Sequence, residues 1–301
     1  MGYPKISILV AAYKSEKVIQ DTINHYVKEV KYPNFEVLFG VDTEEDRTIN
    51  IVRKAAKKHK KIIVDFSKKR RGIINTMNSL LMRAKGDIIV KFDAEFRFLN
   101  PSTCLHKLIR YYKSPDVGAV AFNMKHPKYL DKEIVVSRLV KAQSFMSQVV
   151  CDWKRDRYPI IRGRFDMPLI VHSFRRGIFT KIDRDTINDD AEFAYKTLDK
   201  GFEIRFAKDI YAYALDEPAN LLQVFHRQRR TRVGWIKTAK RRKLNFKKYY
   251  ASLFLYLIFN FYNYSIYELV SLFYFAFAYS IAMFGAFFKI NEKITKIWLR
   301  K

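Results

Sequence analysis

Strand-type and helix-type segments alternate along the first part of the chain, and this alternation limits the folds open to it. Four short apolar segments have the length of buried strands, and segments with helical periodicity separate them. The four are residues 5–10, 35–41, 61–66 and 87–92. Alternation of this kind is typical of a parallel sheet with helices on both faces. We therefore predict an α/β fold with a Rossmann-like, mostly parallel sheet.

Acidic side chains follow two of these segments at the point where each strand should end. Asp42 follows the second segment, and Asp93 and Glu95 follow the fourth. In open parallel sheets, ligands bind at the carboxyl ends of the strands. Two carboxylates one residue apart can both reach a divalent cation that keeps waters and binds a substrate phosphate. The pattern indicates a hard divalent cation held against a diphosphate, although such pairs also occur in solvated turns.

The chain is strongly basic, with a formal charge of +27 from 57 Lys and Arg against 30 Asp and Glu. This excess favours phosphate-bearing substrates, acidic lipid surfaces or nucleic acid. Aromatic and basic residues interleave between Cys151 and Pro168, which suits either single-stranded nucleic acid or a sugar-acceptor groove. A nucleic-acid-binding protein is one alternative, but acids at the strand ends would repel a phosphate backbone. We therefore predict no nucleic-acid partner.

The order of these segments resembles the family-2 glycosyltransferases of the GT-A fold. Asp93-Ala94-Glu95 stands where that family has D-x-D, with Glu95 in place of the second Asp. Ala11 and Lys14 differ from the usual Pro and Asn of the first loop. The other residues that carry the resemblance are Ala12, Tyr13 and Glu16, the run Tyr32–Val37 with Asp42, the run Asp46–Thr48, Gly72 with Asn78, and the run Ala84–Asp87.

The resemblance implies a nucleotide-sugar donor. Asp42 would accept a hydrogen bond from the base, as a carboxylate suits the imide of uracil, although Asp42 could also be a turn or helix-capping residue. Asp93 and Glu95 would hold Mg²⁺ or Mn²⁺, and which of them dominates stays open. Ile73 stands where the family has Lys, so Arg70 or Arg71 would contact phosphate instead. The remaining donor contacts implied for this part of the chain are Ala12, Tyr13, Glu16 and Asn78.

A second acidic motif lies near residue 190. Asp189-Asp190 resembles the family's E-D motif at the start of a helix, with Asp189 in place of Glu. By this resemblance Asp190 is the general base that deprotonates the attacking hydroxyl. A single base without a protein nucleophile implies inversion at the anomeric carbon. The alternative is helix capping, since acids are stabilising at any helix N-terminus.

A basic segment follows, similar to the one that carries Q-x-x-R-W in membrane-bound polysaccharide synthases. Gln228 matches, but Thr231 stands where Arg is expected and Trp235 lies three residues late. These departures weaken a prediction of processive polymerisation. The segment could also lie against anionic lipid as a juxtamembrane helix. The donor diphosphate contacts implied here are Gln228, Arg229, Arg230, Arg232 and Trp235.

Residues 249–288 are aromatic and aliphatic, and Glu268 is their only charged residue. Such a length suits two membrane spans of ~20 residues each, or alternatively a pair of interfacial or core helices. Basic residues flank the block on both sides, so a two-span hairpin would place both flanks and the catalytic domain on the cytoplasmic face. We predict a GT-A domain over residues 1–235, followed over 236–301 by a basic interfacial helix and a transmembrane helical hairpin.

The expected function is metal-dependent, inverting transfer of a sugar from a nucleotide-sugar, UDP-linked by the resemblance, to a lipid-linked or growing glycan acceptor at the membrane. The departures at Glu95 and Thr231 leave a second alternative, a catalytically altered membrane scaffold of the same fold.

Overall fold

The computed structural model describes residues 2–42, 45–125, 149–178, 180–183, 186, 188–215, 221–245 and 247–259. The chain forms two compact units. The first contains Met1–Asn123, Ile160–Gly163 and Ile170–Asp216, and the second contains Met124–Pro159, Arg164–Leu169 and Glu217–Lys301. The predicted functional boundary at residue 235 stays a prediction.

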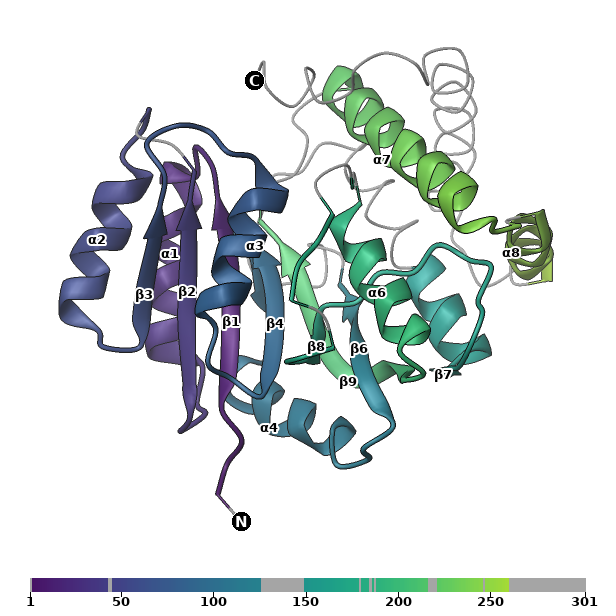
Figure 1. Cartoon of the computed structure of the whole chain (residues 1–301), viewed down its shortest axis with the longest axis horizontal. Coiled ribbons are helices and arrows are strands. Elements are labelled where there is room, and N and C mark those ends of the chain that lie inside the picture. Colours follow the sequence, from purple (N-terminus) through teal and green to yellow (C-terminus); the bar gives the residue numbers. More distant parts are fainter. Residues whose placement is uncertain are drawn as a thin grey trace. The chain divides into compact units, whose positions relative to one another are not determined.

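The first four strands form the parallel part of the sheet in the first unit (Figure 1). They lie in the order β3-β2-β1-β4, and every neighbouring pair is parallel. All residues of β1 and β2 are buried, as expected for strands covered on both faces. The sequence-based prediction of these strands is confirmed, with bounds β1 (Ile6–Ala12), β2 (Phe35–Val41), β3 (Ile62–Phe66) and β4 (Ile88–Asp93).

The helices between these strands cover both faces of the sheet. The chain moves from β1 to β2 to β3 in one direction and then crosses back to β4. Right-handed crossovers in opposite directions put the first two helices on one face and the third on the other. Consistent with this, α1 packs against α2, whereas α3 packs on β1 and β2. These helices are α1 (Glu16–Asn24), which continues as the π-helical turn η1 (His25–Glu29), α2 (Thr48–Lys58) and α3 (Ile73–Arg83).

Beyond β4 the sheet includes short antiparallel pairs, which the prediction of a mostly parallel sheet did not describe. The sheet continues β4-β8-β6-β9-β5, with β7 added on β9, and the pairs β4–β8, β6–β8, β5–β9 and β7–β9 are antiparallel. Only Ala94 and Glu95 separate β4 from β5, too few for a parallel crossover, so β5 does not continue the parallel order beside β4 and pairs instead with β9. The elements are β5 (Phe96–Phe98), α4 (Pro101–Tyr111), β6 (Val117–Met124), β7 (Ile160–Ile161), β8 (Ser173–Arg175), α6 (Asp189–Asp199) and β9 (Glu203–Ala214).

The second unit is helical where it is described. Residues 149–157 are helical, and α7 (Leu221–Arg242) and α8 (Lys247–Phe259) follow later in the chain. Trp153 and Met167 are buried, and Tyr158 and Phe165 pack against them together with Leu253 and Tyr256 of α8. Trp153 therefore belongs to a small core, and Tyr158 and Phe165 pack against it while keeping some exposed surface. The two interpretations of this segment stay predictions.

Among the helices that the structure describes, none combines the length and the hydropathy required to cross a membrane. The predicted hairpin reaches the described chain only in α8, which has 13 residues and leaves Leu255 and Phe259 exposed. From residue 260 onward the hairpin lies outside the described residues.

Candidate active site

The order of the parallel strands reverses between β1 and β4. From β1 the chain proceeds toward β3, whereas β4 lies on the other side of β1. A switch point of this kind leaves a crevice outside the carboxyl ends of the two strands, where ligands bind in open α/β sheets. Asp93 is the last residue of β4 and lies in register with Ala11 of β1. The proposed metal motif therefore lies at the switch point.

Backbone hydrogen bonds fix the turn that carries Asp93 and Glu95. The Ala94 N–H donates to the Ala11 carbonyl over 3.0 Å, and the Leu215 N–H donates to the Glu95 carbonyl over 3.0 Å. The Thr22 hydroxyl donates to the Ala94 carbonyl over 2.5 Å. Both acidic residues are half-buried. The turn is thus held in place through its main chain, while Asp93 and Glu95 each keep some exposed surface.

Asp42 lies at the neighbouring strand end and organises the loop before α3. Its N–H donates to the Ala12 carbonyl over 3.1 Å. Its buried carboxylate accepts hydrogen bonds from the backbone N–H groups of Arg71 (2.8 Å) and Gly72 (2.7 Å). Gly72 has φ +81°, a conformation that an L side chain rarely adopts. Asp42 therefore has a structural role beside the proposed contact with the base, which stays a prediction.

Arg71 lies in an ionic network at the same edge. Its guanidinium pairs with Asp65 of β3 and donates through Nε to the Thr76 hydroxyl over 3.3 Å. Arg83 also pairs with Asp65, over 3.1 Å. The Arg71 guanidinium thus has a buried carboxylate as a partner, while the Arg70 guanidinium lies 4.0 Å from the centre of the Tyr13 ring. Both remain candidates for the phosphate contact.

Two further predicted donor residues make contacts within the protein. One carboxylate oxygen of Glu16 accepts the Arg47 N–H over 3.2 Å, where α2 begins. The Asn78 side chain is buried and donates to the Ile182 carbonyl over 2.9 Å, while its oxygen accepts the Ile182 N–H over 2.7 Å. Asn78 therefore fastens the segment before α6 onto α3. Its role toward a donor stays a prediction, and the observed contacts are structural.

Lys91 connects the metal motif with the second acidic motif. This lysine is two residues before Asp93 in β4 and is 6% exposed. Its ammonium lies 2.7 Å from Asp189 Oδ2 and donates a short hydrogen bond to Asp190 Oδ1. Asp190 is 99 residues away in the sequence, so this contact brings the start of α6 to the end of β4. The proposed base and the proposed metal ligand therefore belong to one site.

The ionisation of this cluster follows from its burial and its charges. Burial alone would lower the pKa of Lys91, but the carboxylates of Asp189, Asp190 and Asp93 outweigh it and raise that pKa well above its usual value. Burial raises the pKa of Asp189, and the Lys91 ammonium opposes this rise. The 2.7 Å contact favours the ionised pair. The cluster thus contains a fixed positive charge at neutral pH.

The donor set fits a hard divalent cation. Within the described residues no group of three or more His, Cys, Asp and Glu side chains could hold a metal by itself. Asp93 and Glu95 supply two carboxylates, and Mg²⁺ is usually bound by one or two carboxylates together with waters and substrate phosphates. The residues present therefore suit a metal that completes its coordination with a diphosphate.

The donor contacts predicted for the basic segment lie on α7 in the second unit. Trp235 is buried there and Arg230 is half-buried. The side chains of Gln228, Arg229 and Arg232 lie outside what the structure describes. The proposed contacts of these five residues with a diphosphate stay predictions.

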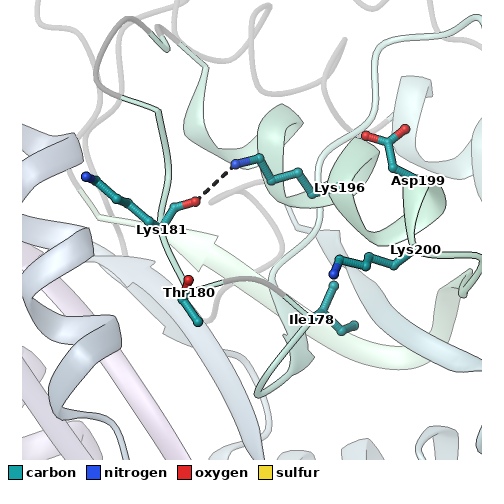
Figure 2. A pocket seen from close by; sticks show the side chains of 6 residues that line it. All are labelled: Ile178, Thr180, Lys181, Lys196, Asp199 and Lys200. Carbon is teal, nitrogen blue, oxygen red and sulfur yellow. Dashed lines mark hydrogen bonds between the residues drawn. The ribbon is translucent and has the colours of Figure 1, made fainter.

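An open pocket of about 330 Å³ lies elsewhere in the first unit (Figure 2). Lys196 donates to the Lys181 carbonyl across it over 3.0 Å. The pocket contains none of the predicted site residues, and its lysines lie at the surface. Its lining consists of Ile178, Thr180, Lys181, Lys196, Asp199 and Lys200.

Sequence reasoning missed Lys91 and Asp65 as members of the site, and it named Asp189 only as part of the acidic motif without a role of its own. Lys91 gave a usable signal, because it is the only basic residue within strands β1 to β4 and lies two positions before Asp93. Side chains two apart in a strand share a face. A charge on the same face as the metal motif could have been assigned to the site.

Comparisons with known proteins identify glycosyltransferases as relatives of this chain. Residues 7–181 match Glycosyl transferase family 2. The chain is 25% identical over 218 residues to the probable glycosyltransferase YdaM of Bacillus subtilis (strain 168), covering 67% of this chain and 49% of that protein. It is 27% identical over 113 residues to an uncharacterized glycosyltransferase of Haemophilus influenzae (strain ATCC 51907 / DSM 11121 / KW20 / Rd), a match that covers 38% of this chain and 34% of that protein. The chain thus spans about half or less of these relatives.

Solved structures are similar in fold. The mannosyltransferase PcManGT from Pyrobaculum calidifontis, in complex with GDP-Man and Mn²⁺, has a TM-score of 0.60 at 18% identity, covering 99% of this chain and 84% of that chain. S. aureus TarS has a TM-score of 0.51 at 18% identity, and the match covers 76% of this chain and 39% of that chain. The mixed α/β, GT-A-like fold and the enzyme class expected from sequence are confirmed. Because the family match covers more than half of its residues, the chain belongs to glycosyltransferase family 2.

Proposed function

We propose that the protein transfers a sugar from a nucleotide-sugar to a lipid-linked or growing glycan acceptor at a membrane, with Mg²⁺ or Mn²⁺ and with inversion. The observation that carries this proposal is the contact between Lys91 and Asp190, because it joins a candidate base to the strand that ends in Asp93. Related structures contain GDP-Man and Mn²⁺, UDP, or UDP-GlcNAc, which supports a nucleoside diphosphate donor.

Asp93 and Glu95 would hold the metal, which when bound neutralises charge that develops on the leaving diphosphate. Asp190 is half-buried at the start of α6, so its carboxylate can reach both solvent and the site. It would accept the proton of the acceptor hydroxyl as that oxygen attacks the anomeric carbon. Tyr13 and Asp42 would bind the nucleoside at the ends of β1 and β2.

Membrane attachment is part of the proposal and is supported by the charge pattern. Seven Lys and Arg lie between Lys237 and Lys248, five lie between Lys289 and Lys301, and 260–267 contains none. Basic flanks favour the cytoplasmic side. Glu268 would lie at the far interface, because a carboxylate at the bilayer centre costs a few kcal/mol on insertion scales. The catalytic domain would then face the cytoplasm.

The activity can be tested by nucleotide release from a panel of UDP- and GDP-sugars, using the full chain in detergent with Mn²⁺ or Mg²⁺. We expect release from at least one donor, stimulated by a glycan or lipid-linked acceptor. Absence of release from every donor would contradict the proposal and favour an altered scaffold of the same fold.

Topology can be tested with single cysteines placed at Asn263 and Lys296 in a variant that lacks Cys104 and Cys151. In intact cells an impermeant thiol reagent should label position 263 alone, because the hairpin turn faces away from the cytoplasm. Labelling at position 296, or at neither position, would reject the hairpin in favour of one span or an interfacial pair of helices.

A further inference from the structure

We propose that Lys91 is a positioning residue of the transfer reaction, which anchors Asp189 and thereby sets the Asp190 carboxylate beside the strand that carries Asp93. This inference rests on the proposed function, since it assigns a role within the same site. Lys91 cannot itself be the base, because an ammonium group has donors only.

The main chain fixes where the Lys91 ammonium lies. Lys91 is in register with Leu9 of β1, and its N–H donates to the His172 carbonyl over 2.9 Å. Its strand is therefore held on both sides, by β1 and by the segment that leads into β8. The side chain leaves a rigid strand at a buried position, so the ammonium is a fixed point to which a neighbouring element can attach.

The two carboxylates that contact this ammonium differ in exposure. The Asp189 side chain is 12% exposed and the Asp190 side chain is 38% exposed. Adjacent residues of a helix point in directions about 100° apart. A single ammonium that contacts both therefore fixes the rotation of the first turn of α6 and its distance from β4. Asp189 is the buried anchor, and Asp190 retains surface through which an acceptor hydroxyl can approach.

A hydrophobic packing residue could not replace this arrangement. An uncharged residue at position 91 would leave the buried Asp189 without a counter-charge, which is strongly destabilising. Removing both charges avoids that penalty but also removes the link between α6 and β4. The pair Lys91→Met and Lys91→Met/Asp189→Asn therefore separates a loss of folding from a loss of positioning.

The test measures kcat and KM for the full chain in detergent, with its best nucleotide-sugar, for Lys91→Met, Lys91→Arg and the Lys91→Met/Asp189→Asn double variant. The double variant should fold, keep the donor KM within about threefold, and lose kcat by about 10²-fold, the scale of a 1 Å misplacement. Lys91→Arg keeps the cation and should recover part of that loss.

Lys5→Met is the matched control, because Lys5 also pairs with a buried carboxylate, Glu36, over 2.6 Å, but at the opposite edge of the sheet. It should lower stability and leave kcat unchanged. Wild-type kcat in the folded double variant would overturn the positioning role, and so would a change confined to the donor KM. If the wild-type protein itself releases no nucleotide, the proposed function fails, and the positioning role fails with it.

Discussion

The amino ends of the parallel strands form one edge of the sheet, and their carboxyl ends form the other. A lysine pairs with a buried carboxylate at each edge, but we assign the two pairs different roles. At the amino edge, Glu36 of β2 is buried and pairs with Lys5 over 2.6 Å. The same carboxylate accepts the Ser7 hydroxyl over 2.6 Å and the Lys85 N–H over 2.8 Å. Burial opposes its ionisation, yet these partners together lower the pKa of Glu36. The amino edge is a closed network with a structural role.

At the carboxyl edge a lysine again meets buried acid, but the network stays open to solvent. Lys91 contacts Asp189 and Asp190, and Asp190 is the more exposed of the two. Asp93, at the end of the strand that carries Lys91, and Glu95 are half-buried. Asp189 and Asp190 thus share one ammonium, whereas Glu36 accepts a lysine, a hydroxyl and a backbone N–H. Partly exposed carboxylates can bind a cation and a substrate, so we expect the two edges to differ in function although they share residue types.

The largest difference between the edges should appear on substitution of Asp93. Asp93→Ala removes one of two carboxylates available to the metal, so transfer should fall to background. Chelation should do the same to the wild-type protein, and Mn²⁺ or Mg²⁺ should restore only the chelated wild type. Full turnover in excess chelator would show that the carboxyl edge does not use a metal.

Asp190→Asn should have the next largest effect. The amide keeps the shape of the side chain but cannot take a proton, so kcat should fall by about 10²–10⁴-fold while donor KM changes little. Asp199→Asn, at the other end of α6, is the control and should retain activity. Normal turnover of Asp190→Asn would assign the residue to helix capping.

The amino edge should respond in stability and not in turnover. A Cβ at Gly86 would lie 2.3 Å from the Ser7 nitrogen and 2.7 Å from the Ile6 carbonyl carbon, both backbone atoms that cannot move aside easily. Gly86→Ala should therefore cost about 1–3 kcal/mol or more, measured by chemical denaturation, with kcat unchanged once folded. Gly2→Ala, where no atom lies within 4 Å, should change neither quantity. A large fall in kcat of folded Gly86→Ala would break the distinction between the edges.

A smaller effect concerns pH and the buried imidazole of His25. The Phe98 N–H donates to His25 Nε2 over 3.3 Å, so the ring proton is on Nδ1, which lies 2.8 Å from Glu29. Burial lowers the pKa of His25, and Glu29 opposes this only in part. The unfolded imidazole binds a proton near pH 6.5 and the folded one only at lower pH, so stability should decrease as pH falls below about 6.5.

Denaturation midpoints at pH 7 and pH 5 test this expectation. His25→Gln cannot gain the charge, so it should lose less stability on acidification than the wild-type protein does. Equal losses in the two proteins would show that His25 is not the group responsible.

Local pattern was sufficient for the parallel half of the fold. The segment 35–41 matches β2 at both ends, because Pro33 and Asp42 bound a run that is apolar except for Glu36. The direction of the later strands could not be read in the same way. β8 has three residues and β9 pairs with both β5 and β7, so their pairing depends on partners far away in the sequence.

The same limit applies to the site. The acids at the strand ends could be predicted, because parallel strands deliver their carboxyl ends to one edge. The pairing of Lys91 with Asp190, and of Asn78 with Ile182 across 104 residues, depends on how α6 packs. Asn78 shows the consequence, since a residue predicted to contact a donor makes two hydrogen bonds to the protein backbone.

The most direct measurement of the central claim is calorimetric titration of UDP and GDP into the full chain in detergent, with Mn²⁺ and with chelator. If the carboxyl edge is the donor site, at least one nucleotide should bind in Mn²⁺, and binding should weaken strongly in chelator and in Asp93→Ala. Lys5→Met, at the amino edge, should bind like the wild type. Equal binding by Asp93→Ala and wild type, or no binding of either nucleotide, would contradict the account.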